Sequence, residues 1–395
     1  MGADWLGLAQ RWGIIMRRIL AIAGALLISS GAHSAVLSKA AKWDAAARSA
    51  MAKAGAKGMA LAVIDRGQPV FVRSYGARNA KGEPLTKETV MYGASLTKMV
   101  FAYTVMQLVD EGKVDLDRTI GEMLPKPLPD YGNPDAYGHW GDLADDQRWR
   151  TITPRMLLTH SAGFANFWFV EPDEKLRIHF EPGSRYAYSG EGIILLQFAL
   201  EKGLGINLGE EMQRRVFDRF GMANTGMMWR PDFTANLADG WMADGKIEPH
   251  DERSKVRAAG SMDTSIADMA KFAAAFASGK GLSAKSRAEM LRGQLAITSR
   301  SQFPSLIPEA PPAQRWPGLA AGLGVVTFDG PQGRGFFKGG HNDSTGNMMV
   351  CLERRRRCVV LLANDVRAEK AFPGLVETIL GPTGLPWAWE YPPPN

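Results

Sequence analysis

Apolar and polar positions suggest strands near both ends of the chain. Two β-type runs in GMALAVIDRGQPVFVRSYG (58–76) flank Asp65, Arg66 and Gly67, which is a hairpin pattern. Three further runs lie near the C-terminus: GLGVVTF, NMMVCLE and CVVLLAN. Both ends of the chain are therefore predicted to supply strands to a sheet.

The middle of the chain follows a helical period instead. The apolar spacing predicts helices over 95–111 with a stop at Gly112, 154–160, 191–203, 207–219, and 265–277, where Thr264 or Ser265 can cap against Asp268. Pro- and Gly-rich stretches at 121–150 and 293–320 predict surface loops that wall a cleft. The expected fold class is α/β of the α+β type: one antiparallel sheet from both chain ends, covered by helices, with an all-α subdomain inserted.

The first 34 residues have the pattern of a cleaved signal peptide. Arg17 and Arg18 precede an apolar stretch over 19–28, and the small residues Ala32 and Ser34 follow it. The alternative is an uncleaved N-terminal anchor. No later stretch is long and apolar enough to span a bilayer, so we expect a bacterial periplasmic or secreted protein with no stable membrane span after cleavage.

Two cysteines, Cys351 and Cys358, flank LERRRR between two apolar runs. A hairpin centred on Arg354 and Arg355 places the two sulfurs opposite each other. Export to an oxidising compartment favours a cross-strand disulfide, with a pair of free buried thiols as the alternative.

Composition excludes several classes of function. The chain is 45% hydrophobic and 22% charged, as in ordinary globular proteins. Its formal charge of +6 is spread along the sequence apart from the four arginines at 354–357, and no aromatic-interleaved basic stripe accompanies it, which disfavours nucleic-acid binding. Six histidines without an H-E-x-x-H motif or clustered Cys/His ligands predict neither a metal nor another cofactor. No Ser lies in the G-x-S-x-G elbow of an α/β-hydrolase.

The stretch GASLTK contains the chain's one S-x-x-K spacing, Ser95 with Lys98. In a helix that begins near Ser95 the two side chains share a face, and the unpaired backbone N–H of Ser95 can stabilise an oxyanion. Lys98 can serve as a base only if burial or a neighbouring cation lowers its pKa, and the apolar MVFAYTVMQLV that follows indicates a buried helix. The alternative is a capping serine with a surface lysine.

Two other stretches carry compatible chemistry. Tyr188 in RYAYSGEGIILL precedes an apolar helix, and a Tyr between two amines can be held as phenolate or pass protons. In FFKGGHNDSTGN, Lys338 and two glycines lead into a strand, and Gly339 and Gly340 let a substrate approach the strand edge.

The order of these three stretches resembles the serine β-lactamase and penicillin-binding-protein superfamily. GKVDLDRTIGEMLP, ITPRMLLTHSAGF, GSMDTSIADMAKFAAAFASG and CVVLLAND are similar to segments of its class C β-lactamase, D-Ala-D-Ala carboxypeptidase and family VIII esterase branch, over most of residues 45–380. The resemblance implies a β-lactamase/transpeptidase-like fold with a sheet domain (35–90 and 250–395), a mainly helical domain (91–249) and the active site in the cleft between them.

The resemblance also implies roles for individual residues. Ser95 becomes the nucleophile, Lys98 its activating amine, Tyr188 the general base and acid, and Lys338 the cation that tunes Tyr188 and meets an acidic group of the substrate. The oxyanion hole is implied for backbone N–H groups at Ser95 and His341, beside Gly340. His160, in LLTHSAGF, matches a family segment without a catalytic role and is expected to be structural.

Two departures from the family pattern bear on the substrate. The Tyr-x-Asn pattern is Tyr188-Ser189-Gly190 here, without the amide that grips an acylamido side chain, and the Lys-Thr-Gly box is Lys338-Gly339-Gly340, without a hydroxyl for a substrate carboxylate. The expected function is an exported serine hydrolase with a small-molecule or peptide substrate, cleaving an ester, amide or β-lactam bond through an acyl-enzyme on Ser95. The alternative is a catalytically weak or inactive peptidoglycan- or peptide-binding protein.

Overall fold

The computed structural model describes residues 39–392, so the predicted signal peptide and its cleavage site lie outside the described residues. A helix over 39–54 begins the described part. Contacts divide the chain into Met1–Ser49 and Ala50–Asn395, and the second unit contains the sheet and every candidate site residue. Within residues 39–392, no helix combines the length and the apolar character needed to cross a bilayer.

The centre of the second unit is an antiparallel sheet of eight strands in the order β2-β1-β12-β11-β10-β9-β8-β7. Its members are β1 (Gly58–Asp65), β2 (Gln68–Gly76), β7 (Leu295–Ala296), β8 (Ala320–Ala321), β9 (Val326–Gly330), β10 (Gly333–His341), β11 (Gly346–Leu352) and β12 (Arg357–Ala363). The N-terminal hairpin joins the C-terminal strands where β1 pairs with β12. The predicted sheet built from both chain ends is therefore confirmed.

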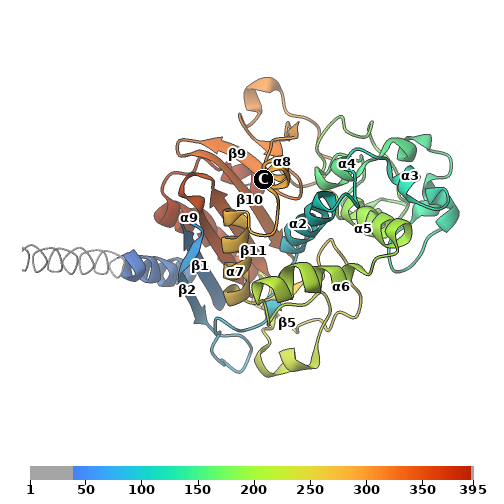
Figure 1. The fold of residues 1–395 in the computed structure, drawn as a ribbon. Coiled ribbons are helices and arrows are strands. Elements are labelled where there is room, and N and C mark those ends of the chain that lie inside the picture. The colour runs from blue at the N-terminus through green and yellow to red at the C-terminus, as the bar shows by residue number, and fades with distance from the viewer. Residues whose placement is uncertain (1–38, 393–395) are drawn as a thin grey trace, which may run out of the picture. The chain divides into compact units, whose positions relative to one another are not determined.

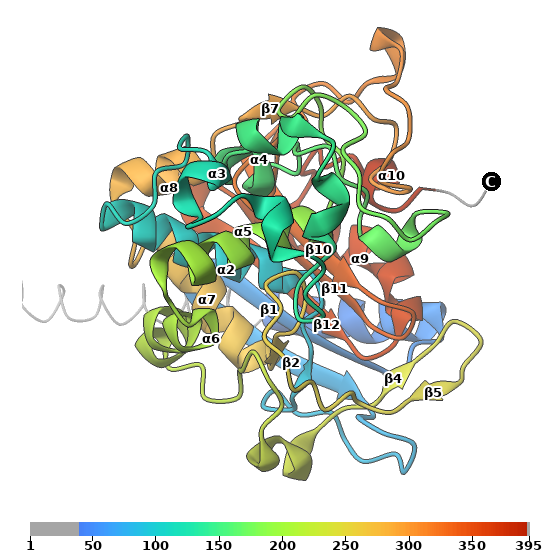
Figure 2. The ribbon, with the colours of Figure 1, turned by 90° about the vertical axis from the view of Figure 1, so that its right-hand side faces the viewer.

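Helices cover both faces of this sheet (Figures 1 and 2). Alternate residues of β1, Ala60, Ala62 and Ile64, belong to one buried apolar cluster with α7 (Ile266–Ser278). On the other face α9 (Phe372–Leu380) packs on β12. A strand that is buried on both faces reads as a continuous apolar run, which is why β1 shows no alternation.

Helices also form the middle of the chain. They are α2 (Leu96–Asp110), α3 (Ile120–Met123), α4 (Pro154–Leu158), α5 (Gly190–Leu204), α6 (Leu208–Met212) and α8 (Ala284–Met290). From Leu96 to Leu108 every residue of α2 is buried, and α2 contacts α6, α8, β10 and β11. This helix therefore joins the helical part of the unit to the sheet, and its first turn lies beside β10. The division into two domains stays a prediction.

Short elements complete the unit. The strands β3 (Met91–Tyr92) and β6 (Asp263–Thr264) pair with each other, as do β4 (Gly240–Trp241) and β5 (Ile247–Glu248). Near the C-terminus, α10 spans Trp387–Glu390.

The structure differs from the sequence pattern in two places. The helix expected over 207–219 ends as α-helix at Met212 and continues as a π-helical turn over Gln213–Asp218. Residues 333–341 form a full strand, although Gly335, Gly339 and Gly340 have little strand propensity. Pairing with β11 along its length stabilises this strand, and a pattern of single residues does not reveal that partner.

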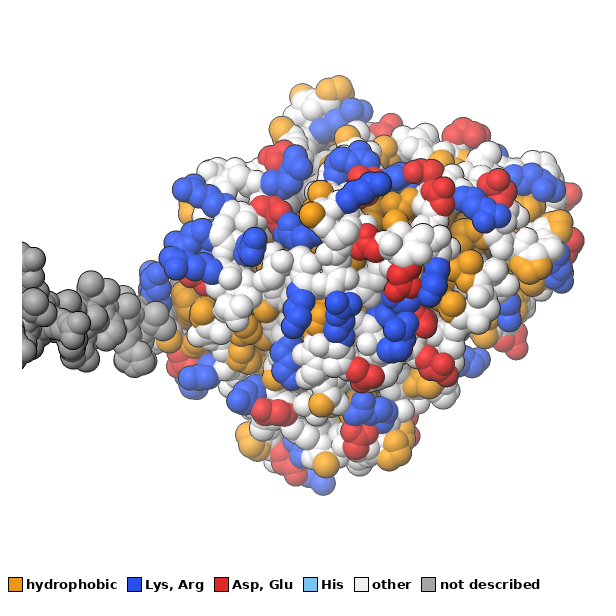
Figure 3. Space-filling model, in the orientation of Figure 1, with side chains coloured by type: hydrophobic (Ala, Val, Ile, Leu, Met, Phe, Trp, Pro, Cys, Tyr) orange, Lys and Arg blue, Asp and Glu red, His pale blue; other side chains and the backbone are white. Residues whose placement is uncertain are grey.

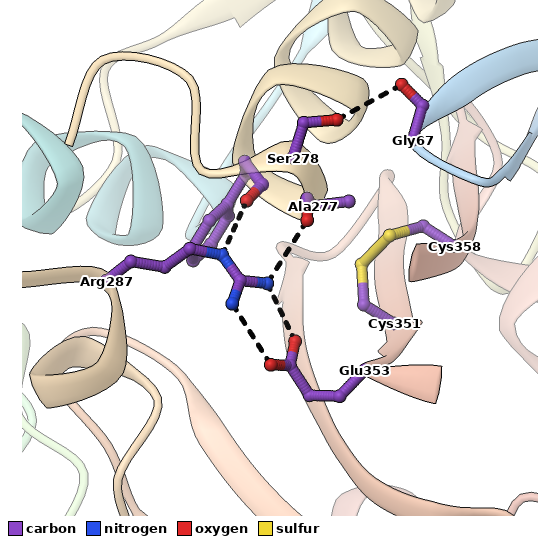
Figure 4. Close-up of a disulfide and its surroundings, with 8 residues drawn as sticks. Gly67, Ala277, Ser278, Arg287, Cys351, Glu353 and Cys358 are labelled. Atoms are coloured by element: carbon purple, nitrogen blue, oxygen red, sulfur yellow. Dashed lines mark hydrogen bonds and ion pairs between the residues drawn. A yellow bond between two sulfur atoms is a disulfide. The ribbon is translucent and has the colours of Figure 1, made fainter. Parts of the chain in front are cut away.

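The C-terminal hairpin of β11 and β12 carries a disulfide between Cys351 and Cys358, which lie opposite each other in the register. Figure 4 shows its surroundings, where the Arg287 guanidinium binds the Glu353 carboxylate and donates to the Ala277 carbonyl. These contacts tie α8 and the end of α7 to the hairpin. On the face drawn in Figure 3, basic side chains are interspersed with acidic ones.

Candidate active site

Ser95 lies directly before the first residue of α2, and its side chain makes no capping hydrogen bond. The residue before it, Ala94, has φ 45°, a left-handed conformation that costs free energy for a residue with a Cβ. The N–H groups of Leu96 and Thr97 donate to the carbonyls of Gly93 and Ala94. The turn therefore caps itself with backbone groups, and the Ser95 hydroxyl remains available for other contacts.

Lys98 follows one helical turn later and brings its amine to that hydroxyl. Its Nζ lies 2.9 Å from Ser95 Oγ and donates to the Ala259 carbonyl at 2.5 Å. The Lys98 side chain is only 1% exposed. The structure thus excludes the alternative of a capping serine with a surface lysine.

Tyr188 approaches the same hydroxyl from another segment, with its phenol oxygen 2.8 Å from Ser95 Oγ. The next residue, Ser189, is the N-cap of α5 and accepts a hydrogen bond from the Gly192 N–H, which fixes the backbone beside Tyr188. The His160 ring lies 4.6 Å from the Tyr188 ring, and its Nδ1 accepts a hydrogen bond from the Ser189 N–H. His160 therefore positions Tyr188 and contacts neither Ser95 nor Lys98 through a hydrogen bond among the described residues.

Lys338, on β10, is buried in the same pocket. Its Nζ lies 5.0 Å from the centre of the Tyr188 ring, as does Lys98 Nζ. Its amine donates to the carbonyl of Gly339 at 2.6 Å. Within residues 39–392 no hydrogen bond joins Lys338 to the oxygens of Ser95 or Tyr188, so it acts on them through its charge.

Burial decides the protonation of these groups. It lowers the pKa of Lys98 well below the ordinary value, and the charge of Lys338 lowers it further. Burial also lowers the pKa of Lys338 to about 8, while Glu390 opposes that fall. In contrast, burial raises the pKa of Tyr188, and the bond with Ser95 offsets only part of the rise. These directions favour a protonated Tyr188 phenol over a phenolate and a neutral Lys98 amine over a charged one.

The strand edge next to Ser95 is open. Residues Lys338 to His341 pair with β11 on one side, while pairing with β9 stops at Phe337 and Val326. A Cβ built on Gly340 would lie 2.8 Å from the backbone nitrogens of both Ser95 and Leu96, so only glycine allows β10 to approach the start of α2. The Ser95 N–H has no hydrogen-bond acceptor in the part of the chain that the structure describes.

His341 ends this strand. Its ring is 38% exposed and its Nδ1 lies 3.3 Å from Glu369 Oε1. The bond with Glu369 raises the pKa of His341. The ring is therefore held toward Glu369.

The four candidate side chains line one cavity of about 590 Å³. Its other walls include residues that carry no motif: Asn166, Phe167, Gln302, Phe303 and Glu390. Tertiary packing brings them there, and Glu390 comes from the C-terminal WAWE segment, which has no signal of function in the sequence. Within residues 39–392 no three His, Cys, Asp or Glu side chains are grouped so as to hold a metal ion.

A half-buried serine alcohol, with a buried lysine amine and a phenol at hydrogen-bond distance beside a sheet edge, is the arrangement of the S-x-x-K serine hydrolases. The sequence model of the family described as Beta-lactamase matches residues 43–379. The chain belongs to the beta-lactamase family.

Curated relatives match parts of the chain. Lovastatin esterase of Penicillium rubens is 29% identical over 203 residues, which are 44% of this chain and 50% of the esterase. D-alanyl-D-alanine-carboxypeptidase/endopeptidase AmpH of Escherichia coli K12 is 27% identical over 298 residues, 71% of each chain. The match thus spans about half the length of the esterase and more of the carboxypeptidase.

Solved structures share the fold. A class C beta-lactamase superposes with a TM-score of 0.69 at 15% identity, covering 87% of this chain and 96% of the other. D-alanine carboxypeptidase AmpC of Burkholderia cenocepacia gives a TM-score of 0.68 at 18% identity, covering 88% and 99%. The predicted β-lactamase/transpeptidase-like fold is confirmed.

Proposed function

We propose that the chain is an exported serine hydrolase that cleaves an ester, amide or β-lactam bond through an acyl-enzyme on Ser95. The observation that carries the proposal is that two polar groups lie at hydrogen-bond distance from Ser95 Oγ: Lys98 Nζ at 2.9 Å and the Tyr188 phenol oxygen at 2.8 Å. One group takes the proton from the attacking alcohol, and the other supplies a proton to the leaving group.

In acylation the neutral amine of Lys98 accepts the Ser95 proton as Oγ bonds to the substrate's carbonyl carbon. The carbonyl electrons move onto oxygen, and the N–H groups of Ser95 and His341 are assigned to that oxyanion, with the free N–H of Ser95 as support. The positive charge of Lys338 favours the anion.

Collapse of this intermediate breaks the bond to the leaving group, which takes the phenol proton of Tyr188. The proton that Lys98 took from Ser95 then passes to the Tyr188 oxygen. In deacylation a water attacks the acyl carbon and gives its proton to neutral Lys98. Ser95 then leaves with the phenol proton of Tyr188, and the proton on Lys98 passes to the Tyr188 oxygen. We assign the acid and base work to this pair jointly, because strongly coupled groups titrate together.

An ester or small amide is favoured as substrate. A Cβ on Gly190 would lie 2.4 Å from Phe167 Cζ, so an aromatic ring fills the space where a side chain at position 190 would begin. A polar acylamido group of a substrate therefore finds no side-chain amide at position 190 to bind, while an apolar acyl group can contact the Phe167 ring. The names of two relatives, an esterase and a carboxypeptidase, are consistent with ester and amide substrates. The periplasmic or secreted location rests on the leader pattern of residues 1–34.

Hydrolysis of 4-nitrophenyl butyrate tests the proposal. We expect Ser95→Ala to lower kcat by at least about a thousand-fold, because a serine hydrolase that loses its nucleophile keeps only the residual catalysis of binding and the oxyanion hole. Ser49→Ala, an exposed helix position outside the cavity, is the matched control and should keep full activity. Intact-mass detection of a fluorophosphonate adduct on the wild type, absent in Ser95→Ala, locates the acyl site.

The missing hydroxyl at Gly339 favours a second candidate, a peptidoglycan- or peptide-binding protein without useful turnover. A wild type that neither hydrolyses acetate and butyrate esters nor forms the adduct would contradict the hydrolase and leave this second candidate.

A further inference from the structure

Glu390 is a buried carboxyl group in the catalytic cavity to which the mechanism above assigns no role. It is 4% exposed and lines the cavity together with Lys338, Gly339, Gly340 and His341. A buried carboxylate is costly unless it has partners, so its position beside the candidate nucleophile requires an explanation.

The C-terminal segment holds this carboxyl firmly. The neighbouring Trp389 is fully buried; its indole N–H donates to Ser299 Oγ, and its carbonyl accepts from the Gln302 N–H. The Gln302 side-chain amide in turn donates to Glu390 Oε2 at 2.8 Å. Glu390 is therefore positioned by packing and by a second side chain.

The carboxyl packs against β10 at Gly339, next to the residues of this strand that line the cavity. A Cβ on Gly339 would be only 2.0 Å from Glu390 Oε1, so the absence of a side chain at 339 makes room for the carboxyl. The Lys338 amine donates to the carbonyl of that same Gly339. The carboxyl of Glu390 and the amine of Lys338 therefore both lie beside Gly339.

Each charge affects the other. Glu390 is the charged group that raises the pKa of Lys338 against burial. Burial raises the pKa of Glu390 above its ordinary value, and Lys338, His341 and the Gln302 bond offset only part of that rise. Lys338 and Glu390 therefore interact electrostatically inside the cavity, without a direct ion pair within residues 39–392.

The following inference rests on the proposed function. We propose that Glu390 is a specificity-determining residue: its carboxyl lies on the side of Lys338 where a substrate anion would bind, and it restricts this part of the cavity to uncharged substrate groups. An anionic substrate group would lose its water and approach a buried carboxylate, and like charges in a desolvated site are strongly unfavourable. The substrate class is therefore a neutral ester or amide, rather than one with a carboxylate beside the scissile bond.

Two pairs of esters test this inference. 4-Nitrophenyl butyrate is compared with mono(4-nitrophenyl) succinate, which has an anionic acyl group, and phenyl acetate with 3-acetoxybenzoate, which has an anionic leaving group. We expect the wild type to favour the neutral member of at least one pair by about a hundred-fold in kcat/KM, and Glu390→Gln to reduce that ratio at least ten-fold by a gain on the anionic ester. Glutamine keeps an oxygen to accept the Gln302 bond. Glu210→Gln, on an exposed carboxyl outside the cavity, is the control and should leave both ratios unchanged.

A geometric test needs no charged substrate. Gly339→Ala should lower neutral-ester activity, and combining it with Glu390→Ala should recover at least part of that loss, because the second change removes the colliding oxygen. Unchanged ratios in Glu390→Gln, or a double variant no better than Gly339→Ala alone, would overturn the inference. Failure of the proposed function looks different, since the wild type would then hydrolyse none of the four esters.

Discussion

At the scale of single residues, burial turns ordinary side chains into reactive ones. A lysine in water is protonated at neutral pH, but Lys98 is enclosed within α2 and faces a second amine, so its pKa falls well below the usual value. The same desolvation raises the pKa of Tyr188 and keeps its proton in place. One physical cause, desolvation, therefore favours a proton acceptor at Lys98 and a proton donor at Tyr188, the two roles that the proposed mechanism requires.

Tyr188→Phe removes the proton donor while keeping the ring that packs on His160. We expect kcat for 4-nitrophenyl butyrate to fall by about two to four orders of magnitude, the usual contribution of a positioned proton carrier. The fluorophosphonate adduct on Ser95 should still be detectable by mass spectrometry. Unchanged turnover would assign all proton transfer to Lys98.

Lys338→Met changes the pH dependence of the reaction. The charge of Lys338 lowers the pKa of Lys98, so its removal raises that pKa, and Lys98 then becomes neutral only at higher pH. The acidic limb of kcat/KM for 4-nitrophenyl butyrate should therefore move to higher pH in this variant. Lys87→Met, at an exposed position, is the control. A limb that stays in place would show that the two amines are not coupled.

At the scale of elements, the site depends on how closely β10 approaches the first turn of α2. The segment from Lys338 to His341 has a free edge because β9 ends its pairing earlier. Gly340 lets this edge lie against the Ser95 backbone, where a substrate carbonyl can meet N–H groups from a strand and from a helix start.

Gly340→Ala should separate the strand from the helix by a few tenths of an ångström or more. A Cβ at 2.8 Å from two backbone nitrogens cannot be accommodated without movement. We expect a loss of activity of at least about a hundred-fold, since a displacement of about 1 Å costs that much, with destabilisation of about 1–3 kcal/mol. Gly374→Ala in α9, where no atom lies within 4 Å of the new Cβ, is the matched control and should unfold at the same or a higher urea concentration. Retained activity in Gly340→Ala would show that this contact does not set the geometry.

At the scale of the whole molecule, the five side chains of the candidate site come from distant parts of the chain. Ser95 directly precedes α2 and Lys98 lies in its first turn, Tyr188 precedes α5, Lys338 lies on β10, and Glu390 comes from the C-terminal segment. The sheet makes this convergence possible, because β1 near one end of the chain pairs with β12 near the other.

Export is a prediction that concerns the whole chain. Expressed from Met1 in a bacterium, the protein should be recovered from the periplasm or medium with its N-terminus near Ala35, because the small residues Ala32 and Ser34 precede that bond. Mass spectrometry of the purified protein measures this directly. An intact leader in the membrane fraction would indicate an N-terminal anchor instead.

Much of the fold was predictable from local patterns. The hairpin of β1 and β2, the buried helix α2 and the Ser265 cap of α7 follow from apolar periodicity and capping chemistry, which neighbouring residues determine. The strand β10 and the π-helical turn after Met212 were not predictable in this way, because distant partners or a local change in hydrogen bonding override propensity there.

For the site, the sequence by itself determined which chemical groups are available: one S-x-x-K pair, a tyrosine before a helix and a lysine before two glycines. Only the tertiary structure decided their distances, their protonation and the presence of Glu390 and Phe167 in the same cavity. The reason is physical, since residue order sets local conformation, whereas desolvation and charge coupling depend on which segments fold against each other.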